Sequence, residues 1–136
     1  MSDYFEEIEH TADYALRVQG RHLAELLVNA AHGMNSLLVS DPSALLPELE
    51  RHFELDAFDA ENLLVKWLTE WAYWAEMERL VFNQFDLTDV TETGLKATVR
   101  GSRVSNLHKH IKAVTYHNLA ITPTDEGLEV TIVFDV

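Results

Sequence analysis

The chain has 136 residues, a length typical of one domain, and its 47% hydrophobic and 24% charged residues are ordinary globular usage. A net charge of −13 argues against stable direct binding to RNA or DNA, because phosphate contacts need clustered Lys and Arg. The absence of cysteine excludes disulfides, a thiol nucleophile and thiolate metal sites. The first nine residues are acidic, unlike a signal peptide, and no apolar run reaches the roughly 20 residues of a membrane helix, so we expect a cytoplasmic protein.

The N-terminal part predicts two strands followed by a helix. Residues 5–9 and 14–19 are expected to be short strands on either side of a polar corner, His10-Thr11-Ala12-Asp13. Apolar residues then recur at helical spacing between Leu23 and Leu38, which predicts an amphipathic helix. Residues 51–56 alternate between apolar and charged side chains and predict a third short strand.

A second helix is predicted from Asp59 to about Glu78. Asp59 is a good N-cap residue, and Phe58 is placed to form a hydrophobic staple with Leu63. The apolar stripe of this helix contains all three tryptophans. We expect them to be core residues and not a platform for stacking bases, because such platforms usually lie beside basic residues and this helix is acidic.

The rest of the chain predicts strands. They are expected at residues 80–90, 95–100, 113–122 and 128–136, with turns at 93–94 and 123–127. The polar segment 102–112 is predicted to be a functional loop or a short helix. We therefore expect an α+β fold: a single domain over residues 1–136, mainly antiparallel sheet, with two helices packed on one face.

Half of the ten basic residues fall in one stretch, together with His108 and His110. They are Lys96, Arg100, Arg103, Lys109 and Lys112. A solvated hairpin and loop would account for such a run of charge, and so would an edge that docks a partner or faces an anion. The sequence leaves both interpretations open.

The end of the chain places two carboxylates side by side. Asp135 precedes the terminal carboxylate of Val136, at the end of the alternating run that begins at Leu128. We expect the last residue to be held in place by this strand. Two adjacent anionic groups are costly unless a cation, a proton or a donor joins them, so this end is a candidate site for a hard metal ion.

The common enzyme signatures are absent. The sequence has no Gly-rich phosphate loop, no nucleophile elbow and no His-Glu-x-x-His helix. His10 and His117 each lie in a short polar cluster beside a predicted strand. Taken alone, each is better explained as a hydrogen-bonded structural histidine than as a metal ligand.

Five segments, taken in order, resemble the archease family. They are Glu9-His10-Thr11-Ala12-Asp13, Asn29-Ala30-Ala31 within the first helix, Leu63-Leu64-Val65-Lys66-Trp67-Leu68, Lys112-Ala113-Val114-Thr115-Tyr116-His117 and Phe134-Asp135-Val136. The resemblance covers nearly the whole chain. The segment 102–111 is the part that we cannot match closely.

This resemblance implies an accessory protein of the RtcB-type RNA ligase, active in tRNA splicing and RNA repair. Such proteins are not themselves the ligase; they accelerate guanylylation of its active-site histidine by GTP and allow multiple turnover. The resemblance also implies a divalent metal ion near the chain ends, with Asp13, Asp135 and Val136 at the matching positions. Oxygen ligands of this kind suit Ca²⁺, our first expectation, or Mg²⁺ or Mn²⁺.

Three further residues are candidates for contact with the partner: His10, Lys112 and His117. Lys112 could contact a phosphate or carboxylate, or it could be a solvated lysine at a strand end. Two other functions also remain open. One is a stand-alone metal-dependent phosphoesterase with Asp13, Asp135 and a histidine base, and the other is a chaperone-like interaction module.

Overall fold

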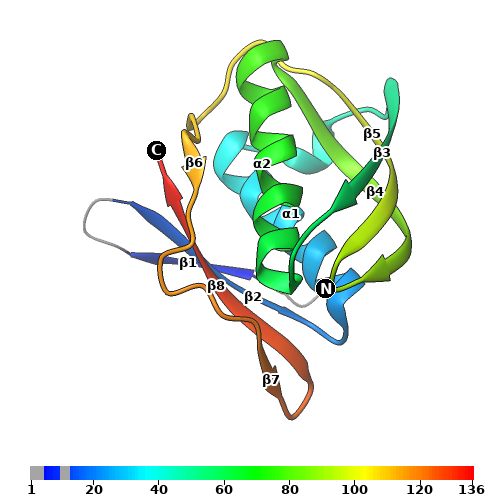
Figure 1. The fold of residues 1–136 in the computed structure, drawn as a ribbon. Helices are drawn as coiled ribbons and strands as arrows, with labels where there is room; N and C mark the ends of the chain where they lie inside the picture. The colour runs from blue at the N-terminus through cyan, green and yellow to red at the C-terminus, as the bar shows by residue number, and fades with distance from the viewer. Residues whose placement is uncertain (1–4, 10–12) are drawn as a thin grey trace.

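The computed structural model describes residues 5–9 and 13–136 (Figure 1). Its elements in chain order are β1 (Phe5–Glu9), β2 (Tyr14–Gly20), α1 (Leu23–Leu38), the 3-10 turn η1 (Pro42–Ala44), β3 (Leu49–Asp56), α2 (Ala60–Glu78), β4 (Leu80–Thr91), β5 (Gly94–Arg103), β6 (Ala113–Val114), β7 (Thr122–Thr124) and β8 (Gly127–Asp135). Within this described part, neither helix is long and apolar enough to cross a membrane.

The strands form two antiparallel sheets with both helices between them. One sheet has the order β1-β2-β8-β6, with β7 also paired to β8, and the other has the order β3-β5-β4. In Figure 1, α1 and α2 lie between the two sheets, with α2 nearer the viewer. This arrangement confirms the α+β class. The division into two sheets was not predicted.

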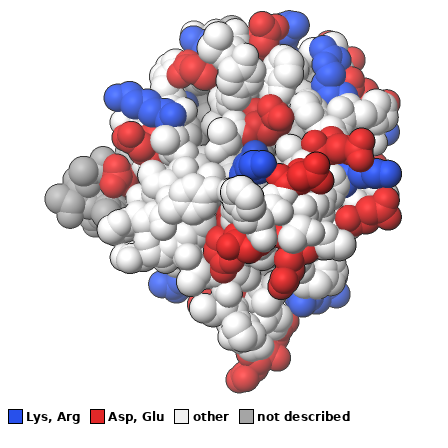
Figure 2. All heavy atoms as spheres, viewed as in Figure 1, with Lys and Arg blue, Asp and Glu red and all other residues white. Residues whose placement is uncertain are grey.

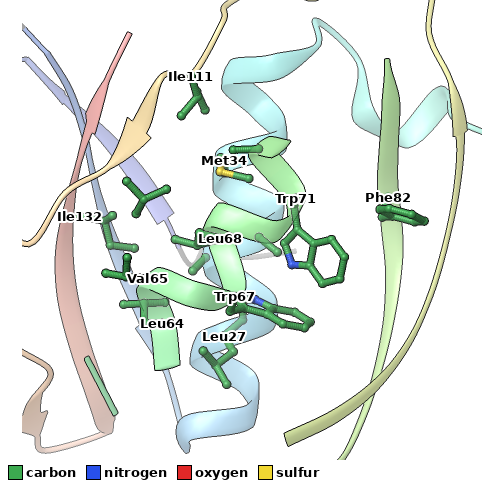
Figure 3. Close-up of a cluster of buried hydrophobic side chains, with 14 of the residues drawn as sticks. Leu27, Met34, Leu64, Val65, Trp67, Leu68, Trp71, Phe82, Ile111 and Ile132 are labelled. Atoms are coloured by element: carbon green, nitrogen blue, oxygen red, sulfur yellow. The ribbon is translucent and has the colours of Figure 1, made fainter. Parts of the chain in front are cut away.

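Both sheets and both helices contribute to one hydrophobic core. The indole nitrogen of Trp67 on α2 donates a hydrogen bond of 2.7 Å to the carbonyl of Leu27 on α1. The rings of Trp67 and Trp71 meet edge to face at 4.8 Å, and Phe82 of β4 lies on the other side of Trp71 (Figure 3). Trp67 and Trp71 are fully buried, which confirms their core role; Trp74 is half-buried.

The start of α2 matches one local prediction and contradicts another. The carboxylate of Asp59 accepts a hydrogen bond of 2.8 Å from the amide of Asn62, as an N-cap should. The predicted staple is wrong, because the Phe58 side chain is 90% exposed whereas Leu63 is fully buried. Instead, Asn62 Oδ1 accepts a hydrogen bond from the amide of Phe58, so a polar contact fixes the chain where it enters the helix.

The predicted strand over residues 113–122 is also wrong over most of its length, because only Ala113–Val114 (β6) and Thr122, the first residue of β7, are strand residues. After Val114, the amide and the hydroxyl of Thr115 both donate to the carbonyl of Val133, at 3.0 Å each. The chain then turns, with a positive φ of 48° at Asn118 and a hydrogen bond from the amide of Leu119 to the carbonyl of Tyr116. These local turn contacts replace further pairing with β8, and β6 is therefore only Ala113–Val114.

Candidate functional site

The pairing of β2 with β8 brings the two predicted aspartates to one end of the sheet. The antiparallel register pairs Tyr14 with Phe134. Asp13, in the bend before β2, precedes the first of these residues and Asp135 follows the second, so the two aspartates come to the same end of the sheet. Phe134 is fully buried, and by alternation the next residue, Asp135, belongs to the opposite face of the sheet. Asp135 is exposed and Asp13 is partly so.

The last residue and the predicted lysine lie at the same end. Ala113 pairs with Asp135, and the amide of Lys112 donates a hydrogen bond of 2.7 Å to the carbonyl of Asp135. Lys112 therefore lies beside Val136. The Val136 side chain is partly buried and packs against the core, so the end of the strand is held, as predicted. In Figure 1 this end of the chain lies beside β6.

A second lysine, Lys109, also lies at this end of the sheet, although it was not among the candidate site residues predicted from the sequence. Lys109 places its Nζ 4.6 Å from the centre of the Tyr14 ring, a cation–π contact. The sequence marks Lys109 only as part of the basic segment, because its contact with Tyr14 links a loop to a strand far away in the chain. We call this end of the sheet the tip, defined by Asp13, Tyr14, Lys109, Lys112, Asp135 and Val136.

The donors at the tip fit a hard divalent cation in their chemistry. Two aspartates at one end of the sheet and the terminal carboxylate of Val136 supply only oxygen atoms, which Ca²⁺, Mg²⁺ and Mn²⁺ prefer. Over residues 5–9 and 13–136, however, His, Asp and Glu side chains form no group of three or more that could hold a metal ion. A metal ion at the tip therefore stays a prediction, one that depends on the terminal carboxylate as the third donor.

The structure does not place either candidate histidine, His10 or His117, at the tip. His10 lies outside the described residues. His117 is exposed and follows β6, where its amide donates to Thr115 Oγ1 and its Nε2 lies 3.3 Å from Asn118 Nδ2. The neighbouring Tyr116 contacts Asn62 in the first turn of α2, so His117 belongs to that corner of the molecule and not to the pairs that form the tip.

The basic segment is partly neutralised by carboxylates. Arg100 contacts Glu50 at 2.9 Å, and Arg103 contacts Glu78 at 3.5 Å. His110 Nδ1 lies 2.9 Å from Glu76 on α2, and this hydrogen bond holds the pKa of Glu76 below its usual range. The ion pairs of Arg100 and Arg103 on β5 agree with a solvated hairpin. Lys109 and Lys112 lie at the tip, and their contact with a partner or an anion stays a prediction.

Residues 104–112, here called the strap, link the second sheet to the tip. The amide of Val104 donates to the carbonyl of Arg79 at the end of α2, and the amide of His108 donates to the carbonyl of Leu38 at the end of α1. Ile111 is buried in the core (Figure 3). The strap is therefore an ordered loop, one of the two structures predicted for this segment, and it crosses the ends of both helices.

Acidic side chains are distributed over the face seen in Figure 2, with single basic residues between them. This distribution agrees with the net charge of −13. It offers a basic partner an acidic surface that extends well beyond the tip.

Residues 5–136 match the model of the archease protein family (MTH1598/TM1083). The chain is 37% identical to the protein archease of Saccharolobus solfataricus, over 97% of this chain and 98% of that one. It is 29% identical to the protein archease of Methanosarcina barkeri, over 97% and 95% of the two chains.

Two solved structures have the same fold. The solution structure of protein 1598 from Methanobacterium thermoautotrophicum covers 99% of this chain and 100% of its own, with a TM-score of 0.81 and 25% identity. The crystal structure of a Thermotoga maritima protein, described as an archease and possible chaperone, covers 96% of each chain with a TM-score of 0.71 and 23% identity. The match over residues 5–136 and the 37% identical relative establish that this chain belongs to the archease family.

Proposed function

We propose that this chain is a non-catalytic activator of an RtcB-type RNA ligase, which promotes guanylylation of the ligase by GTP and thereby its multiple turnover in tRNA splicing and RNA repair. Membership of the archease family supports this proposal over residues 5–136. The structural observation that carries it is the tip, where the pairing of β2 with β8 brings Asp13 and Asp135 to one end of the sheet and the backbone of Lys112 binds that of Asp135. The proposal includes a cytoplasmic location, where the lack of cysteine is unremarkable.

The tip can present both signs of charge to the partner. In the proposed role, Asp13, Asp135 and the Val136 carboxylate hold a divalent cation, with Ca²⁺ preferred over Mg²⁺ or Mn²⁺ for a site of exposed carboxylates. When bound, the cation would neutralise these carboxylates and supply positive charge at the contact with the ligase. Lys112, fixed through its backbone on the carbonyl of Asp135, presents its ammonium group to a phosphate or carboxylate of the partner.

The surface charge fits a partner that handles RNA. A ligase that binds RNA needs a basic surface, and the acidic activator would be steered towards it at low salt. The same negative net charge disfavours direct binding of the activator to RNA. The proposal therefore includes a protein partner and no stable direct contact with nucleic acid.

The decisive experiment measures covalent GMP loading of a purified RtcB-type ligase at limiting GTP, with and without this chain. We expect the chain to raise the rate of loading and the number of ligation turnovers, and Asp135→Asn to reduce the stimulation at least about tenfold. The matched control is Asp125→Asn, which removes an exposed carboxylate in the turn before β8, and it should stimulate like the unchanged chain. An unchanged loading rate with the unaltered chain would refute the proposal.

Incubation of the chain alone with Mn²⁺ and phosphoester substrates examines the phosphoesterase alternative. Turnover that is lost in Asp13→Asn and Asp135→Asn would replace the activator role with an enzymatic one.

A chaperone-like module is the second candidate, favoured by the description of the Thermotoga maritima protein as a possible chaperone. This function predicts that the chain suppresses aggregation of unrelated unfolded proteins. The suppression should be equal in the Asp135→Asn variant, because the tip has no part in it. An activator specific for the ligase should instead leave the aggregation of such proteins unchanged.

A further inference from the structure

Exposed hydrophobic side chains gather along one helix. The described residues include five large hydrophobic side chains that are mainly exposed, and three of them lie on α2 or at its start: Phe58, Tyr73 and Met77. A fourth, Tyr116, is hydrogen-bonded to the same helix. Single exposed hydrophobic residues are normal on a protein surface, but four along one helix mark a candidate contact surface.

The first pair forms a fixed aromatic corner at the start of α2. Asn62 holds both members, because its Oδ1 accepts from the amide of Phe58 at 3.0 Å and its Nδ2 donates to the hydroxyl of Tyr116 at 2.6 Å. The ring of Phe58 is 90% exposed and does not serve the staple that its position suggests. A large apolar ring that is exposed on a fixed backbone, outside the core, can serve as an anchor for a partner.

The second pair lies near the other end of the same helix. Tyr73 and Met77 are one helical turn apart and therefore neighbours on the helix surface. The Tyr73 ring packs edge-on against Trp74, with ring centres 5.8 Å apart, which restricts its position. Met is a side chain that adapts its shape to a contacting surface. In Figure 1 this helix is turned towards the viewer, with no other element drawn across its middle.

Carboxylates adjoin both pairs of side chains: Asp59 follows Phe58, and Glu76 precedes Met77. Lys66, the only cation of α2, donates a hydrogen bond of 2.7 Å to the carbonyl of Asp56. Glu76 binds His110, which follows Lys109 of the tip, so the exposed face of α2 is continuous with the tip through a single contact. Aromatic rings beside carboxylates are complementary to arginine and lysine side chains.

We propose that the exposed face of α2, with Phe58, Tyr116, Tyr73 and Met77 as anchors, docks this chain on a basic and apolar surface of the ligase. This inference rests on the proposed function. In this inference the two surfaces have different roles. The exposed face of α2 provides most of the affinity for the ligase, and the tip stimulates its guanylylation. Loss of the anchors therefore weakens binding without lowering the maximal effect, whereas loss of a tip carboxylate lowers the maximal effect.

The double variant Phe58→Ser/Met77→Ser examines this division. Both side chains are largely exposed, so the variant should fold like the unchanged chain, which circular dichroism and a thermal melt would verify. The matched control is Leu46→Ser, whose side chain is 64% exposed but lies in the loop after η1, away from α2. Calorimetry with the purified ligase gives the dissociation constant, and GMP loading gives the half-saturating concentration and the maximal stimulation.

We expect the double variant to raise the dissociation constant and the half-saturating concentration about tenfold or more, with unchanged maximal stimulation, and Leu46→Ser to change neither. Unchanged binding by the double variant, or an equal loss in Leu46→Ser, would overturn the docking surface while leaving the activator role intact.

If the chain binds the ligase without stimulating GMP loading, weaker binding of the double variant still supports docking, and only the activator role fails. If the unchanged chain does not bind the ligase, both proposals fail. A self-associated chain that the double variant renders monomeric would identify a dimer interface and also overturn the inference.

Discussion

Tyr14 and Phe134 face each other in the antiparallel pairing of β2 with β8, although 119 positions separate them in the sequence. This one pair fixes the tip, because Asp13 precedes Tyr14 and Asp135 follows Phe134, so both aspartates come to the same end of the sheet. Phe134 is fully buried, so a shift of the register by one residue would expose its ring and turn the aspartates to the other face. The hydrophobic core therefore holds the charged site in position.

An extension of the chain beyond Val136 should weaken metal binding. A short Gly-Ser tail converts the terminal carboxylate into an amide and removes one oxygen donor from the tip, and we expect the dissociation constant for Ca²⁺ or Mn²⁺ to rise at least about tenfold. Isothermal calorimetry of the tailed and natural chains measures this change, with Asp125→Asn as a control for loss of surface charge. Equal affinities would remove Val136 from the ligand set and leave the two aspartates.

Replacement of Trp67 by phenylalanine should destabilise the fold. The variant loses the 2.7 Å hydrogen bond to the carbonyl of Leu27 and leaves a cavity between α1 and α2, which together should lower the free energy of unfolding by about 1–3 kcal/mol. Urea denaturation measures this loss. Tyr73→Phe alters an exposed aromatic residue on the same helix and should change stability by less than about 0.5 kcal/mol. Similar effects of the two substitutions would contradict the structural role of Trp67.

His32 should make the protein less stable in mild acid. Burial against β4, where its ring meets Phe85 at 5.3 Å, lowers the pKa of His32 below its ordinary value. Above pH about 6.5 the imidazole is neutral in both the folded and the unfolded chain. As the pH falls below that value, the unfolded chain binds the proton first, so the free energy of unfolding decreases until the pH passes the pKa of the folded state.

Urea denaturation between pH 7.5 and about 5 would reveal this effect, with His32→Gln as the comparison. The decrease in stability on acidification should be smaller in the variant, because the other titrating groups are common to both chains. Parallel curves for the two chains would show that His32 does not contribute.

Removal of the N-cap of α2 should cost about 1 kcal/mol of stability. Asp59→Ala leaves the amide of Asn62 without its 2.8 Å acceptor, whereas Asp59→Asn keeps an oxygen that can accept the bond. Thermal melts should therefore rank the unchanged chain and Asp59→Asn close together and Asp59→Ala lowest. Equal melting temperatures for the two variants would mean that the charge of Asp59 matters and the hydrogen bond does not.

Elements defined by neighbouring residues could be predicted closely. The bounds of α1 and the Asp59 cap follow from side chains within one or two helical turns, and such signals are present in the sequence itself. The staple of Phe58 and the long strand after Ala113 were wrong because local hydrogen bonds competed with them, from Phe58 to Asn62 in one case and from Leu119 to Tyr116 in the other. The position of Lys109 over Tyr14 could not be predicted because the contact links a loop to a strand far away in the chain.

By itself the sequence determined the order and type of most elements, the core role of Trp67 and Trp71, and the resemblance that the family match confirmed. Only the tertiary structure decided that the strands divide into two sheets around the helices, that Asp13 and Asp135 come to one end of a sheet, and that Phe58 lies in solvent. Helical spacing and capping act over a few residues and are visible in any short window. Strand partners and exposed faces are selected by burial over the whole chain, and a local pattern does not contain that information.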